Sequence, residues 1–306
     1  MSALERKIWI DGKLVPWADA TLHVLSQSVQ RGSLVFDFMS CHWLPAGPAV
    51  FGLHEHVERF LGSVQLAGMR AALGQGEIER AIGAAVRANP GATHVKISAY
   101  YPTPALDVLP RDAHPSIAVA AFRPEEIAPE YTRERPPARL QVADARKMPG
   151  WVLSPQAKLA ASYLYTSVAK AAARADGFDD VLLLDQDGCI AEGSTFSFFW
   201  VESGELFTAP LDVVLAGVTR RVLIELAHDE GLRVHEVQRP LAVLERAQEC
   251  LLTGTSARVW PVAQIGERAF PAPVPGMLTA QLARRLDALL AGSDPKLSPQ
   301  WLQPVG

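Results

Sequence analysis

A segment rich in proline and charge near the middle of the chain constrains the fold more than any other feature. Residues 123–138 read RPEEIAPEYTRERPPA, with many charges and few aliphatic side chains. This composition is typical of a linker, because it offers little apolar surface to bury. A chain of 306 residues is also longer than one hydrophobic core usually supports. The sequence therefore predicts two domains, 1–122 and 138–306, joined by a linker at 123–137.

The first predicted domain contains strands followed by helices. KIWI and KLVPW flank Asp11-Gly12, a strong hairpin signal, and strands continue to about residue 51. Apolar residues then recur at helical spacing in 53–69 and 77–89. Two β-rich runs, HVKISAYY and SIAVAAF, end the segment. This order predicts an α+β domain.

The second predicted domain mixes the same elements. A helix is expected at about 160–175, followed by a hairpin around Asp187-Gly188. The run GVTRRVLIELAHDEGLRV predicts another helix, capped by Thr219 and ended by Gly231. Further strands and a terminal helix follow, and the last dozen residues are expected to form a loosely ordered tail. The fold class predicted for the whole chain is α+β.

Composition and charge exclude several classes of protein. Hydrophobic residues make up 49% of the chain and the net charge is -4, which is typical of a globular protein and argues against nucleic-acid binding. No stretch approaches the length of a membrane span, and the N-terminus lacks a long apolar run after a basic start. We therefore expect a cytoplasmic protein without membrane or nucleic-acid partners. The three cysteines are widely spaced and lack metal-like spacing, so no metal site is expected.

Lys158 differs in context from the other lysines of the chain. It lies in SPQAKLAASYLY, among small and apolar side chains just before a predicted helix. Desolvation in such a place favours the neutral amine that imine formation requires. Taken alone, a lysine at this position more often extends from a helix start into solvent.

Two short turns could bind an anion. One opens a predicted helix, where backbone N–H groups point at an approaching ligand, and the other follows directly after a strand. Each turn alone is more often a plain cap or connection. Together with a guanidinium they could hold one phosphate. The residues concerned are Gly217, Val218 and Thr219 in the first turn, Gly254, Thr255 and Ser256 in the second, and Arg59 on the helix HEHVERF.

Glu192 is the acidic residue that completes this set. It stands in CIAEGSTFSFF, after a hairpin turn and before an aromatic strand. A solvated carboxylate at a strand end is the more common interpretation of such a residue. A buried carboxylate beside a pyridine nitrogen, however, keeps that nitrogen protonated and lets the ring accept electrons.

In this order, the motifs AKLAASY, AEGSTFSFF, LAGVTRR and TGTSA resemble those of the class IV aminotransferases. That family includes branched-chain and D-amino-acid aminotransferases, (R)-amine transaminases and aminodeoxychorismate lyases. The likeness extends to IWIDGKLVPW and HEHVERF, and so covers nearly the whole chain. It implies a two-domain fold of type IV with pyridoxal 5'-phosphate between the domains. It also implies a homodimer in which a second subunit completes each active site.

The resemblance assigns a role to each motif residue. Lys158 resembles the catalytic lysine that forms the Schiff base and shuttles a proton. Glu192 resembles the partner of the pyridine nitrogen, and Tyr163 the hydroxyl near the phenolic oxygen. The residues that resemble the phosphate site are Arg59, Gly217, Val218, Thr219 and Thr255, and Ser256 joins Thr255 as a candidate for a substrate carboxylate.

The predicted substrate pocket departs from the pattern of the branched-chain enzymes in QRGSLVFDFMSCH. Arg31 stands where a tyrosine is usual, Asp37 replaces a glutamate, Phe38 a glycine and Ser40 an arginine, while Phe36 is retained. We expect Phe36, Arg31 and Ser40 to contact the substrate. The bulk of Phe38 is expected either to fill the core or to narrow the pocket.

The sequence thus predicts an aminotransferase that moves an amino group between an amino acid or primary amine and a 2-oxo acid, by a ping-pong mechanism. The donor could be branched-chain-like or a D-amino acid. Loss of the usual pocket arginine predicts a broadened or unusual substrate range. The usual Arg or Tyr of the strand before the linker is also not evident in HVKISAYY, where Lys96, Tyr100 or Tyr101 could serve. Two alternatives stay open, a lyase of the aminodeoxychorismate type and a cofactor-binding protein without turnover.

Overall fold

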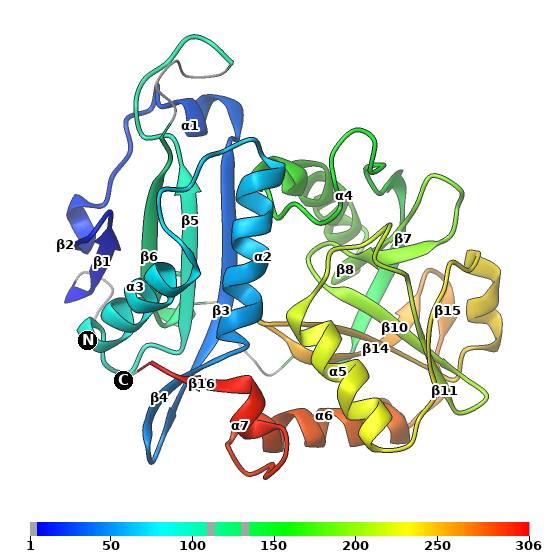
Figure 1. The fold of residues 1–306 in the computed structure, drawn as a ribbon. Helices are drawn as coiled ribbons and strands as arrows, with labels where there is room; N and C mark the ends of the chain where they lie inside the picture. Colours follow the sequence, from blue (N-terminus) through cyan, green and yellow to red (C-terminus); the bar gives the residue numbers. More distant parts are fainter. Residues whose placement is uncertain (1–4, 109–113, 130–134, 306) are drawn as a thin grey trace. The chain divides into compact units, whose positions relative to one another are not determined.

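The computed structural model describes residues 5–108, 114–129 and 135–305 (Figure 1). The chain divides into two compact units. Unit 1 contains residues 1–132, 157–161 and 289–306, and unit 2 contains residues 133–156 and 162–288. Part of the predicted linker, residues 130–134, lies outside the described residues.

The predicted second domain, 138–306, is corrected in two segments. Residues 157–161 belong to unit 1 because Leu159 forms a β-bridge with Val35. Residues 289–306 belong to unit 1 because a strand near the C-terminus joins its sheet. Composition does not reveal such returns of the chain, since they depend on pairing between distant residues.

Within the described residues, unit 1 contains a seven-stranded sheet with the order β16-β4-β3-β5-β6-β1-β2. In the β1–β2 hairpin, Asp11 and Gly12 have φ of 45° and 91°. Two adjacent positive φ values fit the turn expected for Asp-Gly, which confirms the predicted hairpin. The strands are β1 (Lys7–Ile10), β2 (Lys13–Pro16), β3 (Leu34–Leu44), β4 (Gly47–Phe51), β5 (His94–Tyr100), β6 (Ser116–Phe122) and β16 (Leu302–Pro304).

Helices α2 (Leu53–Leu66) and α3 (Gln75–Ala88) pack against this sheet, as the apolar spacing predicted (Figure 1). They cover the face formed by alternate residues such as Val35, Val95 and Val119, which are fully buried. Unit 1 also contains the short helices η2 (Trp17–Asp19), α1 (Gln27–Arg31), η3 (Pro124–Glu126) and α7 (Ser298–Trp301).

The expectation of a loosely ordered C-terminal tail is wrong. Trp301 is fully buried, with its ring centroid 6.1 Å from that of Phe51, and β16 pairs with β4. The Gln303 side chain accepts a hydrogen bond from the N–H of Leu53 at 2.8 Å, at the first residue of α2. These residues therefore extend the sheet and satisfy a donor at a helix start that lacks a side-chain cap of its own.

Unit 2 contains nine strands within its described residues, and six of them form a closed ring. The ring runs β10-β13-β14-β7-β8-β9 and closes because β9 also pairs with β10. Buried residues from these strands, including Leu140, Leu182, Ile190, Phe198 and Leu252, form one core cluster. The strands are β7 (Ala138–Arg146), β8 (Asp180–Leu184), β9 (Ile190–Gly193), β10 (Ser197–Glu202), β11 (Glu205–Thr208), β12 (Val234–Glu236), β13 (Glu249–Gly254), β14 (Arg258–Ile265) and β15 (Arg268–Ala269).

The remaining helices are η4 (Ala160–Tyr163), α4 (Leu164–Ala175), α5 (Val218–Asp229), η5 (Leu241–Arg246) and α6 (Met277–Leu290). The predicted capping of α5 by Thr219 is wrong, because the N-cap is Gly217 and Thr219 lies within the first turn. Gly231 follows the end of α5 with a φ of 76°, as predicted for a glycine that ends a helix. In the described part of the chain, no helix is both long and apolar enough to cross a bilayer.

We expect Gln303→Ala to lower the free energy of unfolding by about 1 kcal/mol, because the N–H of Leu53 loses its acceptor at the start of α2. Urea unfolding followed by circular dichroism measures the change. Gln300→Ala is the matched control, since Gln300 lies in the same segment but is exposed. Equal stability of the two variants would contradict the capping role of Gln303.

Candidate active site

Lys158 is held against the sheet of unit 1 by its backbone. Its N–H donates to Ser63 Oγ at 3.0 Å, and its C=O accepts from the N–H of Phe36 at 3.1 Å. The half-buried side chain places Nζ 4.9 Å from the centroid of the Phe36 ring. The predicted helix begins with a 3-10 turn, η4, that starts two residues later. The amine therefore projects from an extended, hydrogen-bonded segment.

A second lysine approaches the same aromatic ring. Lys96 on β5 has its Nζ 4.8 Å from the Phe36 centroid. Much of the Lys96 side chain is exposed, but partial desolvation of its ammonium group and the nearby Lys158 both lower the pKa of Lys96. Two amines beside one ring create a local site that attracts a carboxylate.

Tyr100 and Tyr101, the other candidates for the usual Arg or Tyr of this segment, are both buried. Burial raises the pKa of each phenol above its ordinary value, so both are neutral hydroxyls at physiological pH. Neither can supply the positive charge that a buried carboxylate requires. Of the three candidates, Lys96 has the chemistry of the missing arginine.

The other predicted substrate residues lie in different surroundings. Arg31 is exposed at the end of α1 and donates to the C=O of Gln30 at 3.4 Å. Ser40 is buried, and its Oγ lies 2.9 Å from Nε2 of His42 on the same strand. The structure therefore brings Phe36 beside Lys158, whereas Arg31 is directed to solvent and Ser40 is engaged within β3.

Phe38 lies in a packed aromatic pair. Its ring stacks on that of His94, with centroids 4.9 Å apart and planes 9° apart. Phe38 and Lys96 are partners in the β3–β5 register, and Phe36 lies two residues away on the same face. The side chain that stands in place of glycine thus forms an apolar wall next to the two lysines.

Arg59 is paired with the buried carboxylate of Asp37. Its Nε and Nη2 donate to Oδ2 and Oδ1 at 2.9 and 2.7 Å, and His56 Nδ1 lies 2.7 Å from Oδ1. Burial alone would raise the pKa of Asp37, but the charge of Arg59 and the hydrogen bonds from Arg59 and His56 hold the pKa of Asp37 well below its ordinary value. A permanent anion therefore fixes the orientation of the guanidinium.

In unit 2, Glu192 forms an ion pair with Lys147, a residue that the sequence did not single out. Their side chains are only 12% and 15% exposed. Burial alone would lower the pKa of Lys147, but Glu192, with Tyr165 and Tyr163 nearby, raises the pKa of Lys147 above its ordinary value. Lys147 is thus an ammonium group rather than a nucleophile. Its position is set by the pairing of β7 with β8, which local sequence does not reveal.

The other predicted motifs of unit 2 meet at the start of β10. Ser197, the first residue of that strand, is paired with Glu192 on β9 and with the end of β13. A Cβ atom on Gly217 would lie 2.9 Å from Ser197 Oγ, so the start of α5 approaches the same point. Thr255 and Ser256 follow directly after β13. The sequence did not identify Ser197, the residue that these motifs surround.

Val218 and Thr219 begin α5, and both side chains are buried. Their backbone N–H groups belong to the first turn of a 12-residue helix, where the partial positive charge of the helix dipole concentrates. This confirms the predicted position of the pair at a helix start. Such a turn is suited to a phosphate or carboxylate.

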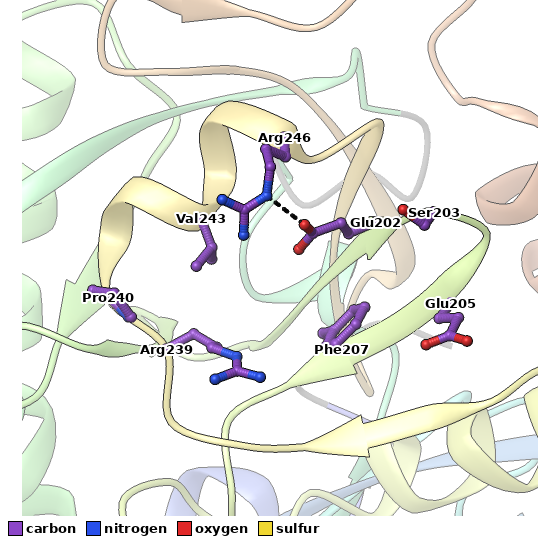
Figure 2. A pocket seen from close by; sticks show the side chains of 8 residues that line it. All are labelled: Glu202, Ser203, Glu205, Phe207, Arg239, Pro240, Val243 and Arg246. Atoms are coloured by element: carbon purple, nitrogen blue, oxygen red, sulfur yellow. Dashed lines mark hydrogen bonds and ion pairs between the residues drawn. The ribbon is translucent and has the colours of Figure 1, made fainter.

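Unit 2 also contains a cavity of about 450 Å³ beside the β10–β11 hairpin and η5 (Figure 2). Arg246 at its rim pairs with Glu202 at 2.5 Å, and Arg239 projects from the opposite side. None of the site residues predicted from sequence lines this cavity. In the parts of the chain that the structure describes, no cluster of three or more His, Cys, Asp or Glu side chains could hold a metal ion.

Comparison with protein families decides among the functional classes. Residues 34–265 match the family model described as Amino-transferase class IV, which is more than half of the chain. The chain is a class IV aminotransferase. Its fold and enzymatic class therefore agree with the resemblance found in the motifs.

Relatives of this aminotransferase span its full length. The branched-chain-amino-acid aminotransferase of Pseudomonas aeruginosa is 27% identical over 286 residues, which is 93% of each chain. The crystal structure of the branched-chain aminotransferase from Thermoproteus uzoniensis with norvaline has a TM-score of 0.90 and 30% identity, and covers 98% of this chain and 99% of that one. The branched-chain enzyme from Thermobaculum terrenum, in its PLP-form, has a TM-score of 0.89 and 27% identity, with 99% of both chains covered.

We expect Lys147→Met to lower the free energy of unfolding by about 3 kcal/mol at neutral pH, because Glu192 is left as an unpaired buried charge. Since the pKa of Lys147 is raised in the folded state, the pair stabilises the fold below the ordinary lysine value of 10.5 and this contribution is lost as the pH rises above it.

Urea unfolding of the wild type, of Lys147→Met and of Lys147→Arg, at neutral pH and above pH 10.5, measures this effect. Lys147→Arg keeps the positive charge and is the matched control. A stability difference between the wild type and Lys147→Met that stays constant across this pH range would show that the pair does not act through charge.

Proposed function

We propose that this aminotransferase uses pyridoxal 5'-phosphate, with Lys158 as the residue that binds the cofactor covalently. The observation that carries the proposal is the position of Lys158, whose amine lies beside Phe36 on a backbone fixed by two hydrogen bonds. A positioned amine is what imine formation requires. The PLP-form of the Thermobaculum terrenum relative supports the choice of cofactor.

The donor groups of this chain fit such a cofactor. The start of α5 packs closely against Ser197, since a Cβ atom on Gly217 would lie 2.9 Å from Ser197 Oγ, and the N–H groups of its first turn are suited to an anion. Glu192, which is paired with Lys147, has the side chain that suits a protonated pyridine nitrogen. We assign the phosphate to a set made of Arg59, Gly217, Val218, Thr219 and Thr255.

In the proposed reaction, the main task of the protein is to transfer the α-proton of the substrate. When bound, the cofactor supplies an aldehyde carbon that accepts an amine and a ring that stores the electrons of the broken Cα–H bond. With the cofactor bound, Lys158 Nζ would be the base that takes the proton from the substrate α-carbon and the acid that returns it. Glu192 retains the proton on the pyridine nitrogen, and Tyr163 orients the phenolic oxygen.

We propose aliphatic amino acids as donors and 2-oxo acids as acceptors, exchanged by a ping-pong mechanism. The named relatives are branched-chain enzymes, and one of them is bound to norvaline. Phe36 and Phe38 offer an apolar wall for such side chains. Ser256 is assigned to the α-carboxylate, and Lys96 supplies a cation for a distal carboxylate. None of these relatives is a lyase.

We also propose that this enzyme is a homodimer and is cytoplasmic, as the sequence analysis expects. The resemblance to class IV enzymes implies that a second subunit completes the active site. Sedimentation analysis of the purified protein tests the assembly, because a monomer with full transaminase activity contradicts it.

We expect the purified enzyme to show an absorbance band near about 410 nm that bleaches when a suitable amino acid is added, and we expect Lys158→Ala to lack both the band and the activity. Spectra recorded with a panel of L- and D-amino acids and of (R)- and (S)-amines identify the donor class. A band that persists unchanged in Lys158→Ala would refute the assignment of Lys158.

We expect Lys96→Met to raise KM for 2-oxoglutarate by about tenfold, with little effect on a monocarboxylic 2-oxo acid, because a buried carboxylate needs a cation. Steady-state kinetics with both acceptors measures the ratio. Lys7→Met, a charge change at an exposed position of β1, is the control. If Lys96→Met affects both acceptors equally, Lys96 does not recognise the distal carboxylate.

A further inference from the structure

Asp37 places a charge on a face of the sheet that is otherwise apolar. It is fully buried, and its neighbours on the same face of β3, Val35, Met39 and Cys41, are buried hydrophobic residues. Transfer of a carboxylate from water is unfavourable unless hydrogen bonds replace its hydration. Packing alone favours an apolar side chain at this position, so the charge points to a further role.

The Asp37 carboxylate accepts four hydrogen bonds. Oδ1 accepts from His56 Nδ1–H, from Arg59 Nη2 and from the backbone N–H of Phe38, each at 2.7 Å. Oδ2 accepts from Arg59 Nε at 2.9 Å. Burial lowers the pKa of His56 despite the attraction of Asp37, so the ring acts as a neutral donor. The carboxylate is fixed from three sides.

This arrangement determines the orientation of the Arg59 guanidinium. Nε and Nη2 are committed to Asp37, so the remaining nitrogen, Nη1, is directed away from the carboxylate. The Arg59 side chain is 11% exposed, and its orientation is therefore set before any ligand arrives. A binding group that is already oriented loses little conformational freedom when it meets an anion.

The same two elements also hold Lys158. Ser63, one turn after Arg59 on α2, donates from Oγ to the Arg59 C=O at 2.8 Å and accepts the Lys158 N–H at 3.0 Å. Phe36, which precedes Asp37 on β3, donates its N–H to the Lys158 C=O. Adjacent residues of β3 and α2 thus fix both the guanidinium and the reactive lysine in one frame.

We propose that Asp37 is a positioning residue for the cofactor phosphate, acting through Arg59 with His56 as its second support. The inference rests on the proposed function, in which Arg59 binds the phosphate. It gives a role to a residue that replaces the usual glutamate. The shorter Asp37 side chain still accepts hydrogen bonds from both Nε and Nη2 of Arg59.

The test compares the affinities of the apoenzyme for pyridoxal 5'-phosphate and for pyridoxal, which lacks the phosphate. For Asp37→Asn we expect affinity for the phosphorylated form to fall by about tenfold, because an amide presents a donor to Arg59 where the carboxylate presents an acceptor. Affinity for pyridoxal should stay unchanged. In an Arg59→Gln background, Asp37→Asn should cause no further loss of the preference for phosphate.

Met39→Leu is the matched control, since Met39 lies on the same face of β3 and the substitution preserves its volume. A structural role for Asp37 predicts equal losses of affinity for the two compounds in Asp37→Asn, and this result would overturn the proposal, as would no change in either.

If Asp37→Asn does not fold, His56→Leu removes one donor from the same carboxylate, and a preference for phosphate equal to that of the wild type overturns the proposal. If the wild type binds pyridoxal as tightly as pyridoxal 5'-phosphate, the assignment of Arg59 to the phosphate fails as well. The absorbance band that depends on Lys158 still tests the proposed function separately.

Discussion

The two backbone hydrogen bonds of Lys158 are the contacts on which the candidate active site depends. They attach Lys158, the proposed cofactor-binding lysine, to Ser63 on α2 and to Phe36 on β3. The helix α2 is in turn anchored at its start by Gln303, a residue from the far end of the chain. A line of hydrogen bonds therefore runs from the C-terminal strand through α2 to the lysine. The same hydrogen bonds therefore stabilise the fold of unit 1 and fix the position of Lys158.

The two units each contain one buried ion pair, and the charges of the two pairs are arranged in opposite ways. In unit 1, a buried carboxylate fixes a cation, Arg59, whereas in unit 2 a buried ammonium group, Lys147, fixes an anion, Glu192. Each pair restrains the orientation of a residue assigned to the cofactor. Neither pair is required for packing, since apolar side chains of similar size are often as stabilising. Both are better explained by preorganisation of a polar site.

Local patterns in the sequence were sufficient for the features that depend on local chemistry. Asp11-Gly12 predicts a turn because few other dipeptides adopt two positive φ values, and Gly231 ends a helix for a related reason. Lys158 was predicted as the catalytic lysine from the small side chains around it and from the order of the motifs, and this assignment stays a prediction. The family and the fold class followed from that order, and comparison with known proteins confirmed both.

Features that depend on distant pairing were not recognisable. The return of residues 157–161 to the first sheet, and the ordered strand β16, require partners more than one hundred residues away. Lys147 looked like one charge among several, because its partner Glu192 belongs to another strand. Thr219 was expected to cap α5, but Gly217 occupies the N-cap, where contact with Ser197 leaves no room for a side chain. Tertiary contacts decide each of these cases.

The closed ring of unit 2 has a consequence for how the site responds to thermal motion. Sheets lose structure most readily from an edge strand, whose backbone groups are partly unpaired. Glu192 lies on β9 at the point where the ring closes onto β10, with a paired strand on either side. The strand β9 therefore has a neighbouring strand on both sides and is not an edge strand. The residue assigned to the pyridine nitrogen thus lies away from the sheet edge, whereas β12, at the end of the strand order, is paired with β11 alone among the described strands.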